Sequence, residues 1–187
     1  MPKILENAKE VILREGQVML KEQGYKKFSM RELAKKCEIG LGTVYNYFPS
    51  KQAIVNEIFI CSWNDTLYEL KKIKIIEATF EEKMRLIYKS LERYLKDHIE
   101  TFMEIMTDGK QSIKPNCKSE AYCKKDEVLK PAYDIVQEII EIHKEKREIN
   151  ISIDSGVMSI FIITNMVTII RGIGYSLDDL IDIIKGR

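Results

Sequence analysis

Apolar side chains recur at intervals of three or four residues along most of this chain, the spacing of helices that bury one face. This pattern predicts helices over residues 3–23, 29–37, 41–48, 50–75, 79–107, 127–147 and 154–171, followed by a short last helix after Ser176. We expect a break near His98, and the pattern leaves the start of the sixth helix open between Glu127 and Pro131. Residues 108–125 are polar and lack apolar spacing, so they are predicted to form a loop. The chain is therefore predicted to be all-α.

The stretch from Ser29 to Lys51 has the pattern of two short helices joined by a tight turn. Ser29 precedes Glu32 by three residues, the capping-box spacing that satisfies free N–H groups at a helix start. Residues 38–40 interrupt the apolar spacing, and Pro49 ends the second helix because a residue before proline disfavours helical geometry. Two apolar-faced helices joined in this way match the helix-turn-helix plan. An ordinary helical hairpin is the plain alternative.

The segment FSMRELAKKCEI followed by GLGTVYNYFPSK resembles the N-terminal DNA-binding domain of tetracycline-repressor (TetR) family transcriptional regulators. The likeness covers residues 12–59, and the pattern G-T-x-Y-x-Y-F-P-S-K is seldom met outside that family. Beyond Phe59 the resemblance is one of size and helical character alone. It implies a three-helix helix-turn-helix domain over residues 1–50 and a helical ligand-binding and dimerisation domain over residues 51–187.

The resemblance also implies which residues contact DNA. Arg31 resembles a residue that reaches a phosphate or a base edge, and Lys51 is similar to a lysine that commonly holds a phosphate. Exposed Thr, Tyr and Asn side chains can donate hydrogen bonds to phosphates and to base edges in a major groove. The residues expected at the DNA are Ser29, Arg31, Gly42, Thr43, Tyr45, Asn46, Tyr47 and Lys51.

Three positions depart from the family's pattern. Glu38 stands where a turn glycine is usual, so we expect a left-handed backbone there at a cost of about 1 kcal/mol. Gly40 replaces the usual serine cap of the second helix and is a weaker cap by a few tenths of a kcal/mol. Leu41 replaces a frequent lysine, which removes a phosphate contact and offers an apolar group to a thymine methyl instead.

The most apolar stretch is residues 154–171, in which no charge appears from Ser155 to Ile170. It is too short and too interrupted by polar residues to span a membrane. Apolar side chains surround this helix almost completely, so it needs partners on more than one side, and a second subunit is the natural one. The resemblance implies a four-helix dimer interface built from the last two helices. The residues expected in it are Val157, Met158, Phe161, Ile162, Asn165, Ile169, Leu180 and Ile184.

Aromatic and methionine side chains in the second domain suit an adaptable apolar pocket for a small-molecule effector, and they equally suit a plain helical core. Trp63 is better explained by packing between domains than by ligand contact, and His98 is expected at the surface. The candidate pocket residues are Trp63, Tyr88, Tyr94, Phe102, Met103, Met106 and Tyr133.

Composition limits the remaining possibilities. With 187 residues, of which 45% are hydrophobic and 32% charged, the chain is long enough for one or two globular domains. The net charge of +1 does not by itself favour nucleic acid, but residues 1–60 carry ten Lys and Arg against seven Asp and Glu. The four cysteines form no C-x-x-C pair, so no metal site is expected, and the role of Cys117 and Cys123 stays open. The charged N-terminus is no signal peptide, which predicts a cytoplasmic protein.

The sequence contains no phosphate-binding loop, dinucleotide fingerprint or H-E-x-x-H motif, and its two histidines accompany no nucleophile. We therefore expect no catalytic residues, no cofactor and no enzyme. The expected function is a sequence-specific regulator that binds a double-stranded operator as a homodimer and is released by a small, apolar ligand. A helical protein-interaction module and a regulator without a small-molecule ligand are the alternatives, and the sequence leaves repression and activation both open.

Overall fold

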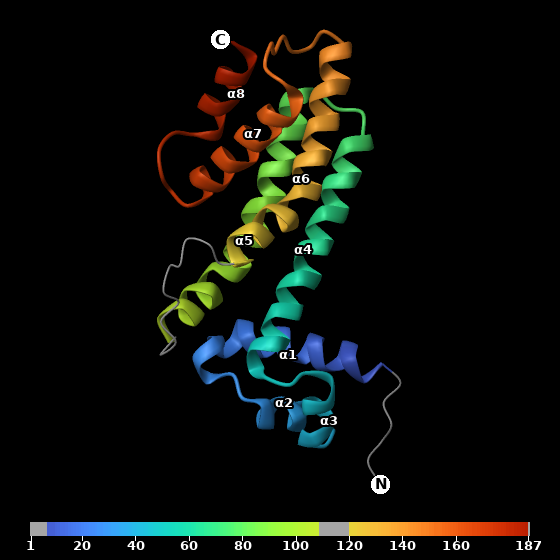
Figure 1. The fold of residues 1–187 in the computed structure, drawn as a ribbon, viewed down its shortest axis with the longest axis vertical. Helices are drawn as coiled ribbons and strands as arrows, with labels where there is room; N and C mark the ends of the chain where they lie inside the picture. The colour runs from blue at the N-terminus through green and yellow to red at the C-terminus, as the bar shows by residue number, and fades with distance from the viewer. Residues whose placement is uncertain (1–6, 109–119, 187) are drawn as a thin grey trace. The chain divides into compact units, whose positions relative to one another are not determined.

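The structure, a computed structural model, describes residues 7–108 and 120–186, which form helices and no strand (Figure 1). This confirms the all-α class. The helices in chain order are α1 (Ala8–Lys27), α2 (Met30–Lys36), α3 (Leu41–Tyr47), α4 (Lys51–Ile75), α5 (Phe80–Asp108), α6 (Glu120–Glu145), α7 (Ser155–Ile170) and α8 (Leu177–Lys185).

The chain divides into two compact units. Unit 1 combines Met1–Asn64 with Lys96–Ser112, and unit 2 combines Asp65–Leu95 with Ile113–Arg187. Helices α4 and α5 therefore each contribute residues to both units. The domain boundary expected after residue 50 lies inside unit 1, because the start of α4 belongs to the same unit as the first three helices. The end of α5 belongs to that unit as well.

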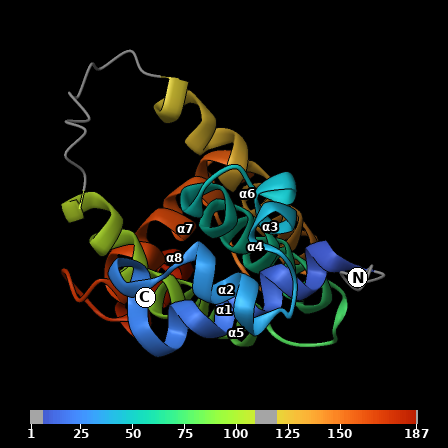
Figure 2. The ribbon, with the colours of Figure 1, turned by 90° about the horizontal axis from the view of Figure 1, so that it is seen from below.

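Unit 1 is built on one apolar cluster that α1, α2, α3 and the start of α4 share, and α2 contacts both α1 and α3; Figure 2 shows these helices from below. Gly16 lies in the interior of α1, where a glycine would ordinarily weaken a helix. A Cβ atom at Gly16 would lie 3.3 Å from methyl groups of Ile54 and Ile58, so the glycine lets α4 approach closely. The buried members are Ile12, Met19, Leu20, Phe28, Met30, Leu33, Ala34, Cys37, Val44, Phe48, Ile54, Val55 and Ile58.

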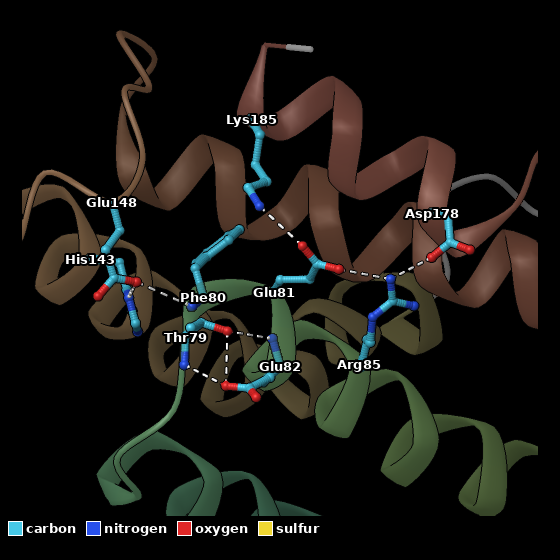
Figure 3. Close-up of polar contacts among 9 residues, drawn as sticks. All are labelled: Thr79, Phe80, Glu81, Glu82, Arg85, His143, Glu148, Asp178 and Lys185. Carbon is cyan, nitrogen blue, oxygen red and sulfur yellow. Dashed lines mark hydrogen bonds and ion pairs between the residues drawn. The ribbon is translucent and has the colours of Figure 1, made fainter.

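Unit 2 is held together at the start of α5 by a polar network (Figure 3). Thr79 and Glu82 cap α5 reciprocally, since the Thr79 N–H donates to Glu82 at 2.8 Å and the Glu82 N–H donates to Thr79 at 3.3 Å. Glu81 then pairs with Arg85 at 2.9 Å and with Lys185 of α8 at 3.0 Å. These contacts fasten the last helix to the start of α5.

Three helix boundaries differ from the sequence prediction. Helix α5 runs without a break through His98, and the ring of His98 packs against Phe59. Helix α6 begins at Glu120, so residues 120–125 are helical rather than part of a loop, and Pro131 lies inside the helix. Helix α1 continues to Lys27 across a break at Gly24, where φ is 74° and ψ is 174°. The predicted helix end at residue 23 is thus a kink between two helical segments.

Within the described part of the chain, every helix is too short or too polar to cross a bilayer.

Candidate nucleic-acid interface

The pair α2–α3 forms the helix-turn-helix that the sequence predicts. The Ser29 hydroxyl accepts the N–H of Glu32 at 3.5 Å, and Leu33 and Ala34 bury the inner face of α2. Glu38 adopts φ 55°, which confirms the left-handed turn residue. Gly40 caps α3 with no side-chain hydrogen bond, as expected of a weaker cap.

Helix α3 keeps most of its surface outside the core. Val44 is fully buried and anchors the helix, whereas Tyr45 and Tyr47 are each 47% exposed. Asn46 is also exposed, and a Cβ atom at Gly42 would meet nothing within 4 Å. The outer face of α3 therefore presents two phenols, an amide and bare backbone to an approaching partner.

The other residues predicted at the DNA surround α3 with different degrees of exposure. Arg31 is exposed on α2, while Thr43 and Lys51 are partly exposed. The hydroxyl of Ser29 is half-buried and already accepts the Glu32 N–H, so its role in the fold is that of a cap. Whether any of these residues contacts DNA stays a prediction.

Lys51 is held by an aromatic residue that sequence reasoning missed. Its Nζ lies 3.9 Å from the centroid of the Tyr25 ring, a cation–π distance. The Tyr25 hydroxyl donates to the Gln52 side chain at 3.0 Å, and Ser50 caps α4 by accepting the N–H of Ala53 at 3.1 Å. No local sequence pattern could have revealed the contact, because Tyr25 and Lys51 lie in different helices.

His98 was expected at the surface, but the structure places it against other side chains of unit 1. Its Nε2 lies 2.8 Å from the Ser62 hydroxyl and its ring centroid lies 4.7 Å from that of Phe59, so it is not a plain surface residue. Burial lowers the pKa of His98 below its ordinary value. The ring lines a cavity of about 180 Å³ between α1, α4 and the end of α5, whose other lining residues include Gln17, Lys21, Asp97 and Thr101.

The residues predicted to line an effector pocket are spread over both units. Trp63 is buried and Met103 is 55% exposed in unit 1, whereas Tyr88, Tyr94 and Tyr133 are partly buried in unit 2. Tyr133 borders a groove of about 600 Å³ between α6 and α7, together with Gln137, Ser159 and Ile160. The side chains of Phe102 and Met106 lie outside the described residues, so one common pocket stays a prediction.

Four of the residues predicted in the dimer interface are buried within the single chain, and the interface itself stays a prediction. Met158, Ile162, Leu180 and Ile184 are at most 8% exposed within the single chain, because α7 and α8 turn these side chains into the core of unit 2. Val157 and Phe161 are 58% and 40% exposed, and Asn165 and Ile169 are partly exposed. Four other exposed apolar residues of this region were not among the predicted interface residues, namely Ile160, Ile173, Tyr175 and Ile183.

Unit 2 also contains a buried histidine with a carboxylate partner (Figure 3). His143 is 0% exposed, and its Nδ1 lies 2.7 Å from Glu148 Oε2, a contact that lowers the pKa of Glu148. Its Nε2 is buried without a hydrogen-bond partner, and the ring packs edge-on against Phe80 at 5.8 Å. Among the residues that the structure describes, no cluster of His, Cys, Asp and Glu could hold a metal ion.

A capped helix, a left-handed turn residue and a short helix with an exposed polar face define a helix-turn-helix protein of the all-α class. Comparison with known proteins gives the family. Residues 4–58 match the family of bacterial regulatory proteins called tetR. The match covers the helix-turn-helix part of the chain and supports a transcriptional regulator of the TetR family.

Individual proteins similar to this chain include one curated relative and several solved structures of the same fold. The chain is 24% identical over 91 residues to the uncharacterized HTH-type transcriptional regulator YuxN of Bacillus subtilis (strain 168), a match that spans 46% of this chain and only 31% of that protein. A TetR/AcrR-family regulator from Thermobifida fusca YX-ER1 has a similar fold, with a TM-score of 0.67 at 14% identity and coverage of 97% and 96% of the two chains. FadR from Bacillus subtilis, in complex with stearoyl-CoA, has a TM-score of 0.61 at 20% identity, with coverage of 95% and 96%.

Proposed function

We propose that this protein is a homodimeric repressor that binds a pseudo-palindromic operator and is released from it by a small, apolar ligand. The observation that carries the proposal is the outer face of α3, where Tyr45, Asn46 and Tyr47 are exposed beside the uncovered backbone of Gly42. A short helix with these properties can enter a major groove, donate to phosphates and read base edges.

Basic residues support the same surface. Arg31 is exposed on α2, and Lys51 follows α3 at the start of α4, so both cations lie in the sequence on either side of the recognition helix. Neutralising phosphates releases counterions, which makes binding strong at low salt and steeply dependent on ionic strength. In this arrangement Lys51 and the tyrosines supply affinity, while Thr43 and Asn46 supply base recognition.

The exposed apolar side chains of α7 and the segment after it support a dimer. Val157, Ile160 and Phe161 lie on α7 and are 40% to 58% exposed, which is unusual for three large apolar residues so close in sequence. A second copy of the chain would cover them. Two recognition helices would then enter successive major grooves of a two-fold symmetric site.

The ligand part of the proposal draws on a structural relative. The structure of FadR from Bacillus subtilis contains stearoyl-CoA, a molecule with a long apolar chain. In this protein, α4 and α5 each run from unit 1 into unit 2, so a ligand that displaces either helix in unit 2 has a direct route to the helix-turn-helix. Release requires that the ligand bind the DNA-free conformation more tightly than the DNA-bound one.

The direct test is operator binding by the full-length protein. The probe is a duplex made from the DNA that flanks the gene, measured with excess non-specific competitor over a range of salt concentrations. We expect binding by two subunits or a multiple of two, which survives competitor and weakens steeply with salt. If protein refolded free of ligand also selects no sequence from a pool of random duplexes, the proposal is wrong.

A single substitution tests the contact assignment. Tyr45→Ala removes an exposed phenol from α3, so operator affinity should fall about tenfold, the loss of one to two kcal/mol, while the protein stays folded. Tyr68→Ala is the matched control, because Tyr68 is an exposed tyrosine (62%) on α4 in unit 2. Equal operator affinity in the Tyr45 variant and the wild type would show that α3 does not make this contact.

A further inference from the structure

The last turn of α1, after the kink at Gly24, contains two backbone donors that its own helix cannot satisfy. At Gly24 the chain leaves helical geometry, and Tyr25 to Lys27 form a separate helical turn. The first N–H groups of such a turn have no acceptor within their helix and carry partial positive charge. They need an acceptor from elsewhere in the protein.

Glu104, near the end of α5, provides that acceptor. Its Oε2 accepts the N–H of Tyr25 and, at 3.2 Å, the N–H of Lys26. Both partners belong to unit 1, although 78 residues separate Lys26 from Glu104 in the sequence. Bonds from backbone N–H groups to an ionised carboxylate are among the strong hydrogen bonds in proteins.

The glycine at the turn is an independent sign that the carboxylate is seated there. A Cβ atom at Gly24 would lie 3.0 Å from both carboxylate oxygens of Glu104, closer than nearly all real Cβ contacts. The φ of 74° also favours glycine. The absence of a Cβ atom at this turn therefore leaves the space that the Glu104 carboxylate occupies.

The same turn carries the aromatic ring that holds Lys51. The Tyr25 ring lies against Lys51 Nζ at 3.9 Å, and the Tyr25 hydroxyl bonds to Gln52 at 3.0 Å. Fixing the Tyr25 backbone thus fixes the start of α4, directly after the recognition helix. The chain of contacts runs from Glu104 through Tyr25 to Lys51.

We propose that Glu104 is a positioning residue for DNA binding: its carboxylate holds the Tyr25–Lys26 turn so that the Tyr25 ring places Lys51 for a phosphate. This rests on the proposed DNA-binding function. The sign of the effect sets the proposal apart from simple electrostatics. Removing a negative charge from a DNA-binding unit should strengthen binding to a polyanion, whereas removing this positioning contact should weaken it.

Three full-length variants test the proposal on an operator selected with the wild-type protein. Glu104→Ala should bind about tenfold more weakly, because the strong charge-assisted bonds that fix the turn are lost. Glu104→Gln keeps the length of the side chain and one acceptor oxygen, so its operator affinity should stay within about twofold of wild type. Glu100→Ala is the matched control, since it removes the same charge one helical turn earlier on α5 and should bind as well as wild type or better. Unchanged or tighter binding by Glu104→Ala would overturn the proposal, as would an equal loss in the Glu100 variant.

A second measurement works without DNA and separates the two proposals. A Tyr25 ring at 3.9 Å shifts the NMR resonances of the Lys51 side-chain methylene groups upfield, and the Tyr25 and Lys26 amides should exchange slowly. In Glu104→Ala, the upfield shift should diminish and amide exchange should accelerate. If the shift and the exchange rates match wild type, the positioning role is wrong. If they change as expected but wild-type protein binds no duplex, the contact chain stands and DNA binding fails.

Discussion

Two surfaces of this protein are exposed in very different ways. The outer face of α3 presents Tyr45, Asn46 and Tyr47, whose polar atoms can exchange their hydrogen bonds to water for hydrogen bonds to a polar partner. Helix α7 presents Val157, Ile160 and Phe161, which have no such atoms and gain only by being covered. The first surface suits a hydrated, charged partner. The second suits another apolar surface, such as the same face of a second copy of the chain. Exposure alone does not tell what a surface binds; the chemistry of the exposed atoms does.

Placing the same negative charge on each surface tests whether the two surfaces bind different partners. Phe161→Glu should raise the dissociation constant of the dimer by about a hundredfold or more, because a carboxylate would be buried in an apolar interface. Tyr47→Glu should leave self-association unchanged and weaken DNA binding by about tenfold or more through repulsion of phosphate. Analytical ultracentrifugation and operator titration would measure the two effects separately.

Each of these variants is the control for the other. If Phe161→Glu remains as dimeric as wild type, the α7 surface is not the subunit interface. If Tyr47→Glu disturbs self-association, the two surfaces are not independent and the assignment of partners fails.

Acidification should weaken unit 2 through specific carboxyl groups. The pKa of Glu148 is lowered by its hydrogen bond from His143, and that of Glu82 by the backbone N–H of Thr79. A carboxyl group whose pKa is lower in the folded state stabilises the fold at pH values above its unfolded pKa, which is about 4.3 for Glu. That contribution is lost as the pH falls through the folded pKa.

The contribution of these carboxyl groups to the free energy of unfolding should therefore be level at neutral pH and decrease below about pH 4.5, where Glu begins to take up protons. Denaturant titrations between pH 7 and pH 3 would measure it. Glu82→Gln should make the decrease shallower, because one of the groups responsible no longer titrates. An identical decrease in this variant would assign the acid sensitivity to other groups.

The N-terminal caps of α7 and α2 compare the two units through single hydrogen bonds. Asp154 caps α7 by accepting the N–H of Val157 at 3.0 Å, whereas the Ser29 hydroxyl accepts the N–H of Glu32 at 3.5 Å. Asp154→Ala should cost about 1 kcal/mol of the free energy of unfolding, and Ser29→Ala should cost less because its bond is longer. Thermal unfolding of both variants measures the difference. A larger loss for Ser29→Ala would contradict this ranking.

Local chemistry in the sequence predicted the framework of unit 1 well. The Ser29 cap and the left-handed Glu38 could be recognised because each depends on neighbouring residues: a capping spacing and a turn between two apolar runs. Thr79 and Glu82, at the start of α5, have the same three-residue spacing and also form a cap. Short-range hydrogen bonds leave a signature in the order of residues.

Contacts between distant parts of the chain left no such signature. Tyr25 and Lys51 come together only because α1 and α4 share a core, and Glu104 reaches the Gly24 turn from the far end of α5. Helix α7 shows the same limit, because apolar residues surround it almost entirely. Spacing could not tell that Ile162 faces inward and Val157 outward, since packing against α6 and α8 decides the orientation.

The smallest expected effect concerns the cap of the recognition helix itself. Gly40 lies at the start of α3 with φ −66° and ψ 143°, an extended geometry that serine adopts readily, and a Cβ atom there would meet only Thr43 Oγ1 at 3.6 Å. Gly40→Ser should therefore add a hydroxyl acceptor without a clash and stabilise the fold by a few tenths of a kcal/mol. Gly42→Ser is the control, because it adds the same side chain inside α3 instead of at its cap. If Gly40→Ser lowers the free energy of unfolding, the missing serine cap is not a weakness of this helix.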